Sequence, residues 1–208
     1  MMRLHDVTVS LHGRALVRID AEVPSGGVLV LMGPSGSGKS SLLAYVGGFL
    51  DPVFEASGTV TIDGTEVTAL PPPERHVGVL FQDPLLFPHM SVGGNLLFAV
   101  PRGERRRREV AEGALRDAGL DGFYARDPAT LSGGQAARVA LLRVLLSRPR
   151  ALLLDEPFSK LDADRRERVR RFTFATARER DLPVLLVTHD EEDAAAALAE
   201  TQGEVVRL

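Results

Sequence analysis

Residues Val28–Ser41 have the sequence VLVLMGPSGSGKSS. The five apolar residues at its start predict a short strand that is covered on both faces, and the glycines that follow predict a loop. Gly33–Ser40 matches the pattern G-x-x-x-x-G-K-[ST], in which backbone N–H groups close around phosphate oxygens. A helix expected from about Ser40 points the positive end of its dipole at the same anion. We therefore expect a phosphate-binding loop between a buried strand and a helix.

Two further motifs follow along the chain. The apolar run Ala151–Leu154 ends in two adjacent carboxylates, Asp155 and Glu156. Such a pair is costly to desolvate at the end of a buried strand unless a cation lies beside it. Leu131–Gln135 has the sequence LSGGQ, in which Ser132 is a good helix N-cap and the glycines leave the backbone open to an anion. The chain thus offers a second phosphate-binding helix terminus.

The apolar pattern predicts the fold class. Alternating apolar residues in the first part of the chain predict antiparallel strands, with a hairpin turn at Asp63-Gly64. Unbroken apolar runs predict strands of a parallel sheet at Val28–Met32, Val77–Phe81, Ala151–Leu154 and Val184–Val187. Helical spacing predominates between Gln82 and Pro149, where one helix is expected to end at Gly119 and another to follow Ser132.

We therefore expect a single α/β domain over residues 1–208. Its core is predicted to be that of a P-loop NTPase, with a mixed parallel sheet and an antiparallel β subdomain, from residues 1–81 and 150–208. Residues 82–149 are predicted to form an inserted helical subdomain.

Composition narrows the function classes. The net charge of −3 gives no overall field toward nucleic acid or anionic lipid, and the absence of cysteine excludes disulfides and thiolate metal sites. No run of 18 apolar residues and no signal-peptide pattern is present, so we expect no membrane-spanning segment in this chain. Arg102–Glu109 is rich in arginine but has no interleaved aromatic residue, and we interpret it as a solvated helix face.

The three motifs together resemble those of the ATP-binding cassette (ABC) ATPases, and the resemblance covers nearly the whole chain. It implies ATP and Mg²⁺ as cofactors. Lys39 is then expected to reach the β- and γ-phosphates, and Ser40 and Asp155 to hold Mg²⁺. Glu156 matches the general base of the family, and His189 matches its switch histidine, which contacts the γ-phosphate. Gln82, after the strand Val77–Phe81, matches a glutamine that senses the γ-phosphate, Mg²⁺ and the membrane partner.

The resemblance also implies a head-to-tail homodimer. In the family, the LSGGQ signature of one subunit closes over the ATP that the phosphate loop of the other subunit holds. Ser159–Asp162 resembles the D-loop, which crosses the dimer interface, with Lys160 where alanine is commoner. Asp162 also fits as the cap of the helix that follows, and the two roles are compatible.

One departure from the family concerns the adenine base. The family usually stacks an aromatic residue on adenine, some way before the phosphate loop, but Val9–Arg14 contains no Phe, Tyr or Trp. His12 is the candidate by position, because its imidazole can stack, and Leu11 is the alternative. We therefore predict a weak contact to the base.

These assignments give three sets of expected site residues. The catalytic set is Glu156, His189, Gln82 and Lys39. The metal set is Ser40, Gln82 and Asp155. The nucleotide-binding set is Gly33, Pro34, Ser35, Gly36, Ser37, Gly38, Lys39, Ser40, Ser41, His12, Ser132, Gly133, Gly134, Gln135 and Asp162.

The sequences of Phe81–Val92 and Asp127–Ser132 resemble those of cassette-only bacterial importer ATPases. Among these, the whole pattern is nearest to YnjD-type subunits. This implies a transmembrane permease as partner, a periplasmic or lipid-anchored solute-binding protein, and a place at the cytoplasmic face of the inner membrane. No nucleic-acid partner is expected. The alternatives are an ABC exporter ATPase and a soluble ABC ATPase that serves no transporter. The single compact cassette without cysteines argues against the soluble repair and translation members, which carry coiled-coil or zinc insertions or paired cassettes.

Overall fold

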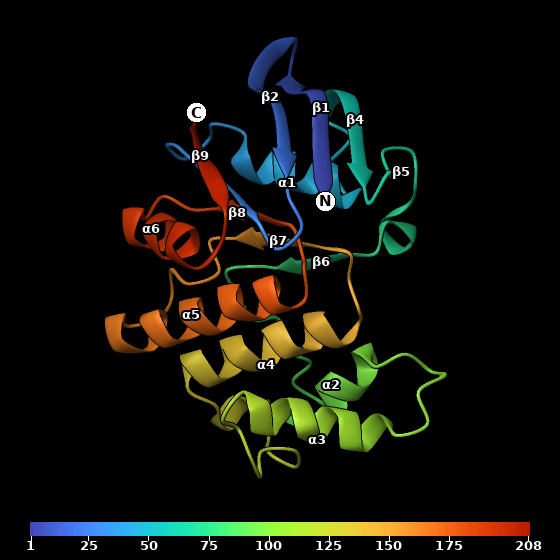
Figure 1. The fold of residues 1–208 in the computed structure, drawn as a ribbon, viewed down its shortest axis with the longest axis vertical. Coiled ribbons are helices and arrows are strands. Elements are labelled where there is room, and N and C mark those ends of the chain that lie inside the picture. The colour runs from blue at the N-terminus through green and yellow to red at the C-terminus, as the bar shows by residue number, and fades with distance from the viewer. The chain divides into compact units, whose positions relative to one another are not determined.

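The strands of the described residues form two sheets (Figure 1). The computed structural model describes residues 1–163 and 166–208. One sheet is antiparallel with the order β2-β1-β4-β5, from β2 (Arg14–Val23), β1 (Met2–Leu11), β4 (Phe54–Ile62) and β5 (Thr65–Glu66). The other has the order β6-β7-β8-β3-β9, from β6 (Val77–Leu80), β7 (Ala151–Asp155), β8 (Val184–Val187), β3 (Val28–Met32) and β9 (Gly203–Arg207). In this second sheet β7, β8, β3 and β9 pair in parallel.

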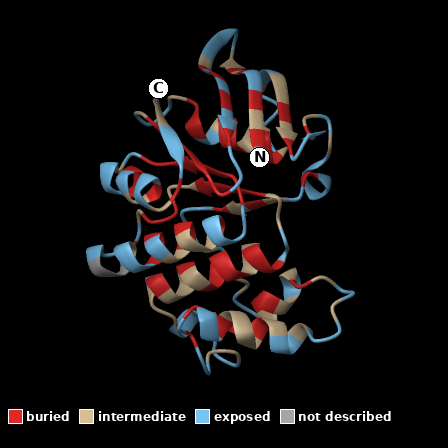
Figure 2. Ribbon diagram, in the orientation of Figure 1, coloured by how far each residue is buried: buried red, intermediate tan, exposed pale blue. Residues whose placement is uncertain are grey.

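The burial of β3 and β8 explains why their apolar runs predicted them correctly, whereas the partly exposed β9 was not predicted. Every residue of β3 and β8 is buried, as continuous apolar runs require of a sheet covered on both faces (Figure 2). The expected hairpin joins β4 to β5, where Ile62 pairs with Thr65. Its turn residues Asp63 and Gly64 have φ of 48° and 74°, the left-handed conformation that Asp-Gly turns favour.

The chain divides into two compact units. The first consists of Met1–Val79, Arg150–Glu156 and Phe174–Leu208, and the second of Leu80–Pro149 and Pro157–Thr173. The helices are α1 (Lys39–Gly47), α2 (Val92–Ala99), α3 (Arg107–Asp117), α4 (Gly133–Leu146), α5 (Ala163–Glu179) and α6 (Glu191–Glu200), with short 3₁₀ turns at Pro72–Arg75 and Pro128–Thr130. The assignment of residues 1–208 to one domain, with the subdomain boundaries given above, stays a prediction.

The first unit has a core shared by both sheets and α1. Its buried members include Leu4 of β1, Leu31 of β3, Leu42 of α1, Leu153 of β7 and Leu185 of β8. Because α1 contributes one face to this core, its N-terminal end is fixed beside the loop that follows β3. The packing of the core therefore positions the phosphate-loop segment.

The other end of α1 is held by a buried arginine. The Arg75 guanidinium, 5% exposed, donates hydrogen bonds to the carbonyl oxygens of Tyr45 and Val46 in the last turn of α1, at 2.8 and 3.0 Å. It also donates to the carbonyls of Leu70 and Thr68. Burial lowers the pKa of Arg75, but four carbonyl acceptors and the negative end of the helix dipole compensate its charge.

The second unit has a core of its own, built from α2, α3 and α4. Leu96, Leu115, Val139 and Leu142 are among its buried members. As predicted, α4 begins after Ser132 and ends before Pro149, and Gly119, with φ of 67°, follows the end of α3.

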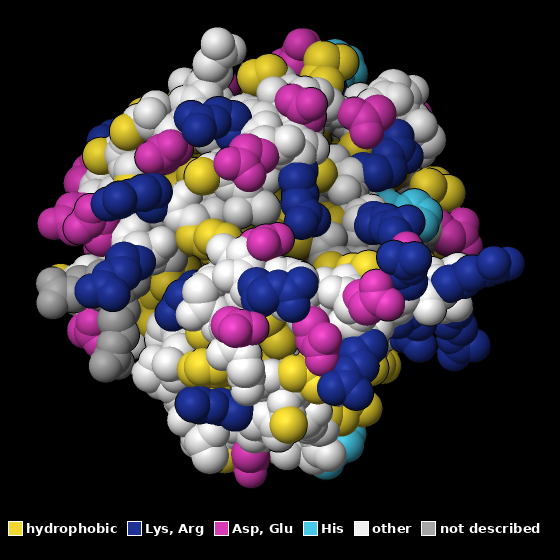
Figure 3. Space-filling model, turned by 60° about the horizontal axis from the view of Figure 1, so that its bottom comes forward, with side chains coloured by type: hydrophobic (Ala, Val, Ile, Leu, Met, Phe, Trp, Pro, Cys, Tyr) yellow, Lys and Arg dark blue, Asp and Glu magenta, His cyan; other side chains and the backbone are white. Residues whose placement is uncertain are grey.

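The arginine-rich segment leads into α3 and forms ion pairs with nearby glutamates. Arg106 pairs with Glu109 at 3.5 Å and Arg108 with Glu112 at 2.9 Å. On the face drawn in Figure 3, acidic side chains lie among the basic ones. These contacts agree with the interpretation of this segment as a solvated helix face.

Candidate functional site

The phosphate-loop segment connects β3 to α1, as predicted. Gly36 and Gly38 have φ of 83° and 91°, which a residue with a side chain rarely adopts. At Gly38, a Cβ atom would also lie 2.9 Å from the Cβ atom of Leu16. The loop can therefore hold its backbone N–H groups in this curve only with glycine at these positions.

Lys39 is the first residue of α1 and is 7% exposed. Its Nζ donates hydrogen bonds to the carbonyl oxygens of Gly33 and Pro34, at 2.8 and 2.7 Å, and lies 3.5 Å from Ser37 Oγ. The ammonium group is thus held within the loop, at the positive end of the helix dipole. This arrangement concentrates positive charge where an anionic phosphate would bind.

Ser40 and Asp155 meet beside this loop. The Ser40 hydroxyl donates a hydrogen bond to Asp155 Oδ1 at 3.2 Å. Burial raises the pKa of the Asp155 carboxyl, the Ser40 hydrogen bond opposes this rise, and the neighbouring Glu156 charge adds to it. A hydroxyl and a carboxylate are the hard oxygen ligands that Mg²⁺ prefers, and a cation would offset the cost of burying this charge. The residues present therefore fit Mg²⁺.

The raised pKa of Asp155 predicts a gain in stability when its charge is removed. Ionisation of this carboxyl costs stability at neutral pH, and the cost vanishes below its ordinary value of 3.8, where folded and unfolded states are both protonated. We expect metal-free Asp155→Asn to melt at a higher temperature than wild type at pH 7. Thermal melts in chelator from pH 8 to pH 4 should show this difference shrink. A lower melting temperature for the variant at pH 7 would contradict the argument.

Glu156 and His189 form the next pair. His189 Nδ1 lies 3.1 Å from Glu156 Oε1, and the Glu156 backbone N–H donates to the Val187 carbonyl at 2.9 Å. Glu156 has φ of 46°, a left-handed conformation that costs about 1–2 kcal/mol. Backbone strain of this kind persists where surrounding structure fixes it, often at functional sites.

A buried hydroxyl fixes the segment that carries His189. Thr188 is 1% exposed and its Oγ1 donates to Asp193 Oδ2 at 3.0 Å, while it accepts from the Asp190 backbone N–H. The imidazole of His189 itself is 64% exposed. A fixed backbone and an exposed ring leave this side chain available to a ligand.

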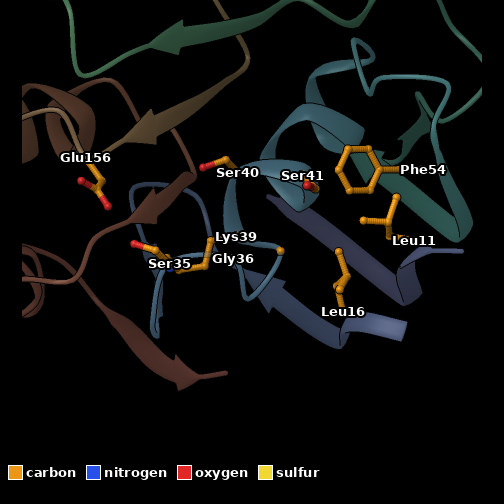
Figure 4. Close-up of a pocket in the computed structure, with 10 residues that line it drawn as sticks. Leu11, Leu16, Ser35, Gly36, Lys39, Ser40, Ser41, Phe54 and Glu156 are labelled. Carbon is orange, nitrogen blue, oxygen red and sulfur yellow. The ribbon is translucent and has the colours of Figure 1, made fainter. Parts of the chain in front are cut away.

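A cavity of about 360 Å³ joins these groups to an apolar region (Figure 4). Its polar lining comes from Ser35, Gly36, Gly38, Lys39, Ser40, Ser41 and Glu156. Its apolar lining comes from Leu11, Leu16 and Phe54. Figure 4 shows these three side chains together at one end of the cavity and Glu156 at the other, with the phosphate loop between them. The cavity therefore suits a ligand with a charged part and a flat apolar part.

His12 does not line this cavity. It is exposed in the turn between β1 and β2, with φ of 51°. Phe54 lies in the lining instead, because β4 pairs with β1 and places Phe54 opposite Leu11. Sequence reasoning missed Phe54, since it follows the phosphate loop and only the pairing of strands brings it back to the cavity.

The remaining predicted residues lie in the second unit. Ser132 caps α4: its hydroxyl accepts from the Gln135 backbone N–H, and the Gln135 side chain accepts from the Ser132 backbone N–H at 2.9 Å. Gly133 and Gln82 both line a cavity of about 150 Å³ within this unit. Asp162 is exposed immediately before α5. The structure thus brings part of the predicted set together in each unit.

A profile of the ABC transporter family matches residues 16–159. The chain belongs to this family. The cassettes of the ABC transporter family are ATPases coupled to transport, so the predicted family and enzyme class are confirmed. Among the described residues, no helix has both the length and the apolar character needed to cross a bilayer.

Curated relatives of this ABC cassette agree with the predicted subgroup. This chain is 46% identical over 200 residues to "Uncharacterized ABC transporter ATP-binding protein YnjD" of Escherichia coli (strain K12). The aligned region covers 94% of this chain and 92% of that protein. This chain is 40% identical to the thiamine import ATP-binding protein ThiQ of the same strain, over 94% and 84% of the two chains. It is 42% identical to the sulfate/thiosulfate import ATP-binding protein CysA of Mycobacterium tuberculosis (strain ATCC 25618 / H37Rv), over 86% of this chain and 51% of that protein.

Solved structures confirm the fold class. The ATP-binding cassette MJ0796, in a dimeric post-hydrolysis state bound to ADP and Pi, matches with a TM-score of 0.79 at 30% identity, over 100% of this chain and 94% of that chain. A second dimeric structure of MJ0796 matches with a TM-score of 0.78 at 29% identity, with the same coverage. The fold is therefore that of a P-loop ABC ATPase.

Proposed function

We propose that this chain binds ATP with Mg²⁺ and hydrolyses it to drive the import of a solute through an ABC transporter. The observation that carries the proposal is the cavity that the phosphate loop, Ser40 and Glu156 line together. Asp155, which accepts the hydrogen bond of Ser40, lies beside it. Phosphate-binding, metal-binding and proton-accepting groups are the parts that phosphoryl transfer to water requires.

Each residue has a distinct role in this proposal. Lys39 and the backbone N–H groups of the loop bind the β- and γ-phosphates. Ser40 and Asp155 hold Mg²⁺, which supplies neutralisation of phosphate charge when it is bound. Glu156 accepts a proton from the attacking water as the new bond to the γ-phosphorus forms and the bond to the ADP oxygen breaks. His189, in contact with Glu156, orients that water and the γ-phosphate. Gln82 senses the γ-phosphate, Mg²⁺ and the membrane partner.

The signature residues are proposed to act in a head-to-tail dimer. This chain offers two helix termini suited to phosphate, at α1 and at α4, and one ATP cannot easily use both from the same subunit. The cassette MJ0796 was solved as a dimer, which supports dimerisation. In it, Ser132–Gln135 of one subunit closes over the ATP of the other, and Asp162 lies near the interface.

The apolar end of the cavity is proposed to hold the base. We expect Phe54→Ala to weaken ATP binding, because stacking of a base on an aromatic ring contributes about 1–3 kcal/mol, or roughly 5–150-fold in affinity. Leu11, Leu16 and Phe54 offer no side-chain hydrogen bond to a base edge, so GTP should compete within about tenfold.

Titrations of ATP and GTP against wild type, Phe54→Ala and His12→Ala test this assignment. His12→Ala is the matched control, because His12 is exposed and does not line the cavity. A loss of ATP affinity in His12→Ala with none in Phe54→Ala would restore His12 as the base contact.

Import is favoured over export by the relatives, since ThiQ and CysA are both import ATP-binding proteins. The proposed partners are a transmembrane permease and a periplasmic or lipid-anchored solute-binding protein, which would place the chain at the cytoplasmic face of the inner membrane. Apolar side chains on the second unit suit a permease contact: Leu85 and Phe98 are 58% and 66% exposed.

Purification of the tagged chain from detergent-solubilised native membranes tests the partners, and a permease is the expected companion. Reconstitution of that complex in vesicles then tests direction. Uptake that needs ATP and a solute-binding protein supports import. Transport in the opposite direction would make the chain an exporter ATPase, and no membrane companion would favour an ABC ATPase that serves no transporter.

A further inference from the structure

An ion pair within the second unit joins two segments that flank predicted catalytic residues. Lys160 Nζ contacts Asp83 Oδ1. Asp83 directly follows Gln82, and Lys160 lies four residues after Glu156 along the chain. The pair therefore ties the segment of the proposed γ-phosphate sensor to the segment that leaves the proposed general base.

The cavity beside this pair shows that the two segments share one packed environment. Gln82 and Lys160 both line the space of about 150 Å³, together with Leu161 and with Gly133 of the signature helix α4. Three proposed motif segments thus meet around one small cavity. Because the two side chains line the same small cavity, a displacement of Lys160 is expected to change the packing around Gln82.

Lysine is unusual in this chain. Of 25 basic residues other than histidine, only Lys39 and Lys160 are lysines, and the rest are arginines. Lys39 lies in the phosphate loop, where an ammonium reaches phosphate oxygens. Lys160 lies outside that loop, and its ammonium group instead contacts the Asp83 carboxylate.

We propose that the Lys160–Asp83 ion pair is a positioning contact that holds the Gln82 segment ready for the γ-phosphate. The proposal rests on the ATPase function proposed above. Lys160 and Asp83 touch no substrate in it: they act through the backbone that carries Gln82. The side chains are 52% and 59% exposed, so solvent and salt screen the pair and its effect is modest.

Kinetics of ATP hydrolysis provide the first test. Lys160→Ala and Asp83→Asn should each lower kcat by about 3–5-fold at low salt, the upper range for an exposed pair, with KM for ATP within about twofold. The double variant should be no slower than either single variant, because both remove one interaction. Lys160→Arg keeps the positive charge and should retain most of the wild-type kcat. The double variant Lys160→Asp/Asp83→Lys exchanges the two charges and should recover most of it. High salt should reduce the differences in kcat between all variants and wild type.

Chemical labelling provides a readout that does not need activity. Amine acylation followed by mass spectrometry can follow Lys160 separately from Lys39, which is buried in the loop. Asp83→Asn should raise the acylation rate of Lys160, and Asp20→Asn, which removes an exposed carboxylate of the first unit, should not. Equal acylation rates of Lys160 in wild type and Asp83→Asn would contradict the ion pair.

The outcomes separate this proposal from the proposed function. If Glu156→Gln hydrolyses ATP normally, the proposed hydrolysis site fails, while labelling still tests the ion pair. Additive effects of the two single variants, an unchanged kcat in both, or a loss of kcat that follows a lower melting temperature would overturn the positioning role. Recovery in the charge exchange with unchanged melting temperatures would support it.

Discussion

Glu156→Gln should lower kcat for ATP hydrolysis by about 10²–10⁴-fold, the usual contribution of a general base. The amide keeps the size of the carboxylate and a contact for His189, but it cannot take a proton from water. ATP should still bind, so the nucleotide-bound dimer should persist in this variant. Steady-state hydrolysis measures the first effect, and size-exclusion chromatography with light scattering in ATP and Mg²⁺ measures the second.

Glu204→Gln is the matched control, since Glu204 lies exposed on β9 and is outside the cavity. It should hydrolyse ATP at the wild-type rate, and its ATP-bound dimer should not outlast that of wild type. Near-normal turnover by Glu156→Gln would remove this residue from the role of base and leave the pair with His189 without a catalytic function.

Mixing two inactive variants should restore activity if the signature acts on the neighbouring subunit. Lys39→Ala disables the phosphate loop, and Ser132→Arg blocks the signature with a bulky cation. In a heterodimer of the two, one site combines an intact loop with an intact signature. Hydrolysis by the mixture should therefore rise well above that of either variant alone.

The control for this experiment places both changes in one chain. Mixing Lys39→Ala with the double variant leaves no intact site, so it should stay inactive. Activity in that control, or none in the mixture of single variants, would contradict the composite site. The measurement is the ATPase rate as a function of mixing ratio at constant total protein.

Much of the fold follows from local patterns in the sequence. The parallel strands β3 and β8 were predictable because burial on both faces demands continuous apolar runs, and both are buried throughout. The turn at Asp63-Gly64 and the start of α4 at Ser132 were predictable because each depends on residues adjacent in the chain. The phosphate loop is predictable for the same reason.

Contacts between distant segments could not be predicted in this way. Phe54 lines the cavity only because β4 pairs with β1, and no local pattern sets that register. The contact between Lys160 and Asp83 likewise depends on tertiary packing. The family pattern places the adenine contact before the phosphate loop, and His12 was predicted there by position, with Leu11 as the alternative.

The arginine at the far end of α1 has a consequence for how the nucleotide site responds to its ligand. With Arg75 holding the last carbonyls and the core holding its face, α1 has little freedom left to lose when an anion arrives. The entropy of ordering this helix is lost during folding, so binding does not bear that cost. Adjustment to the ligand is then expected in the glycine-rich loop, because glycine torsions vary more freely than those of other residues.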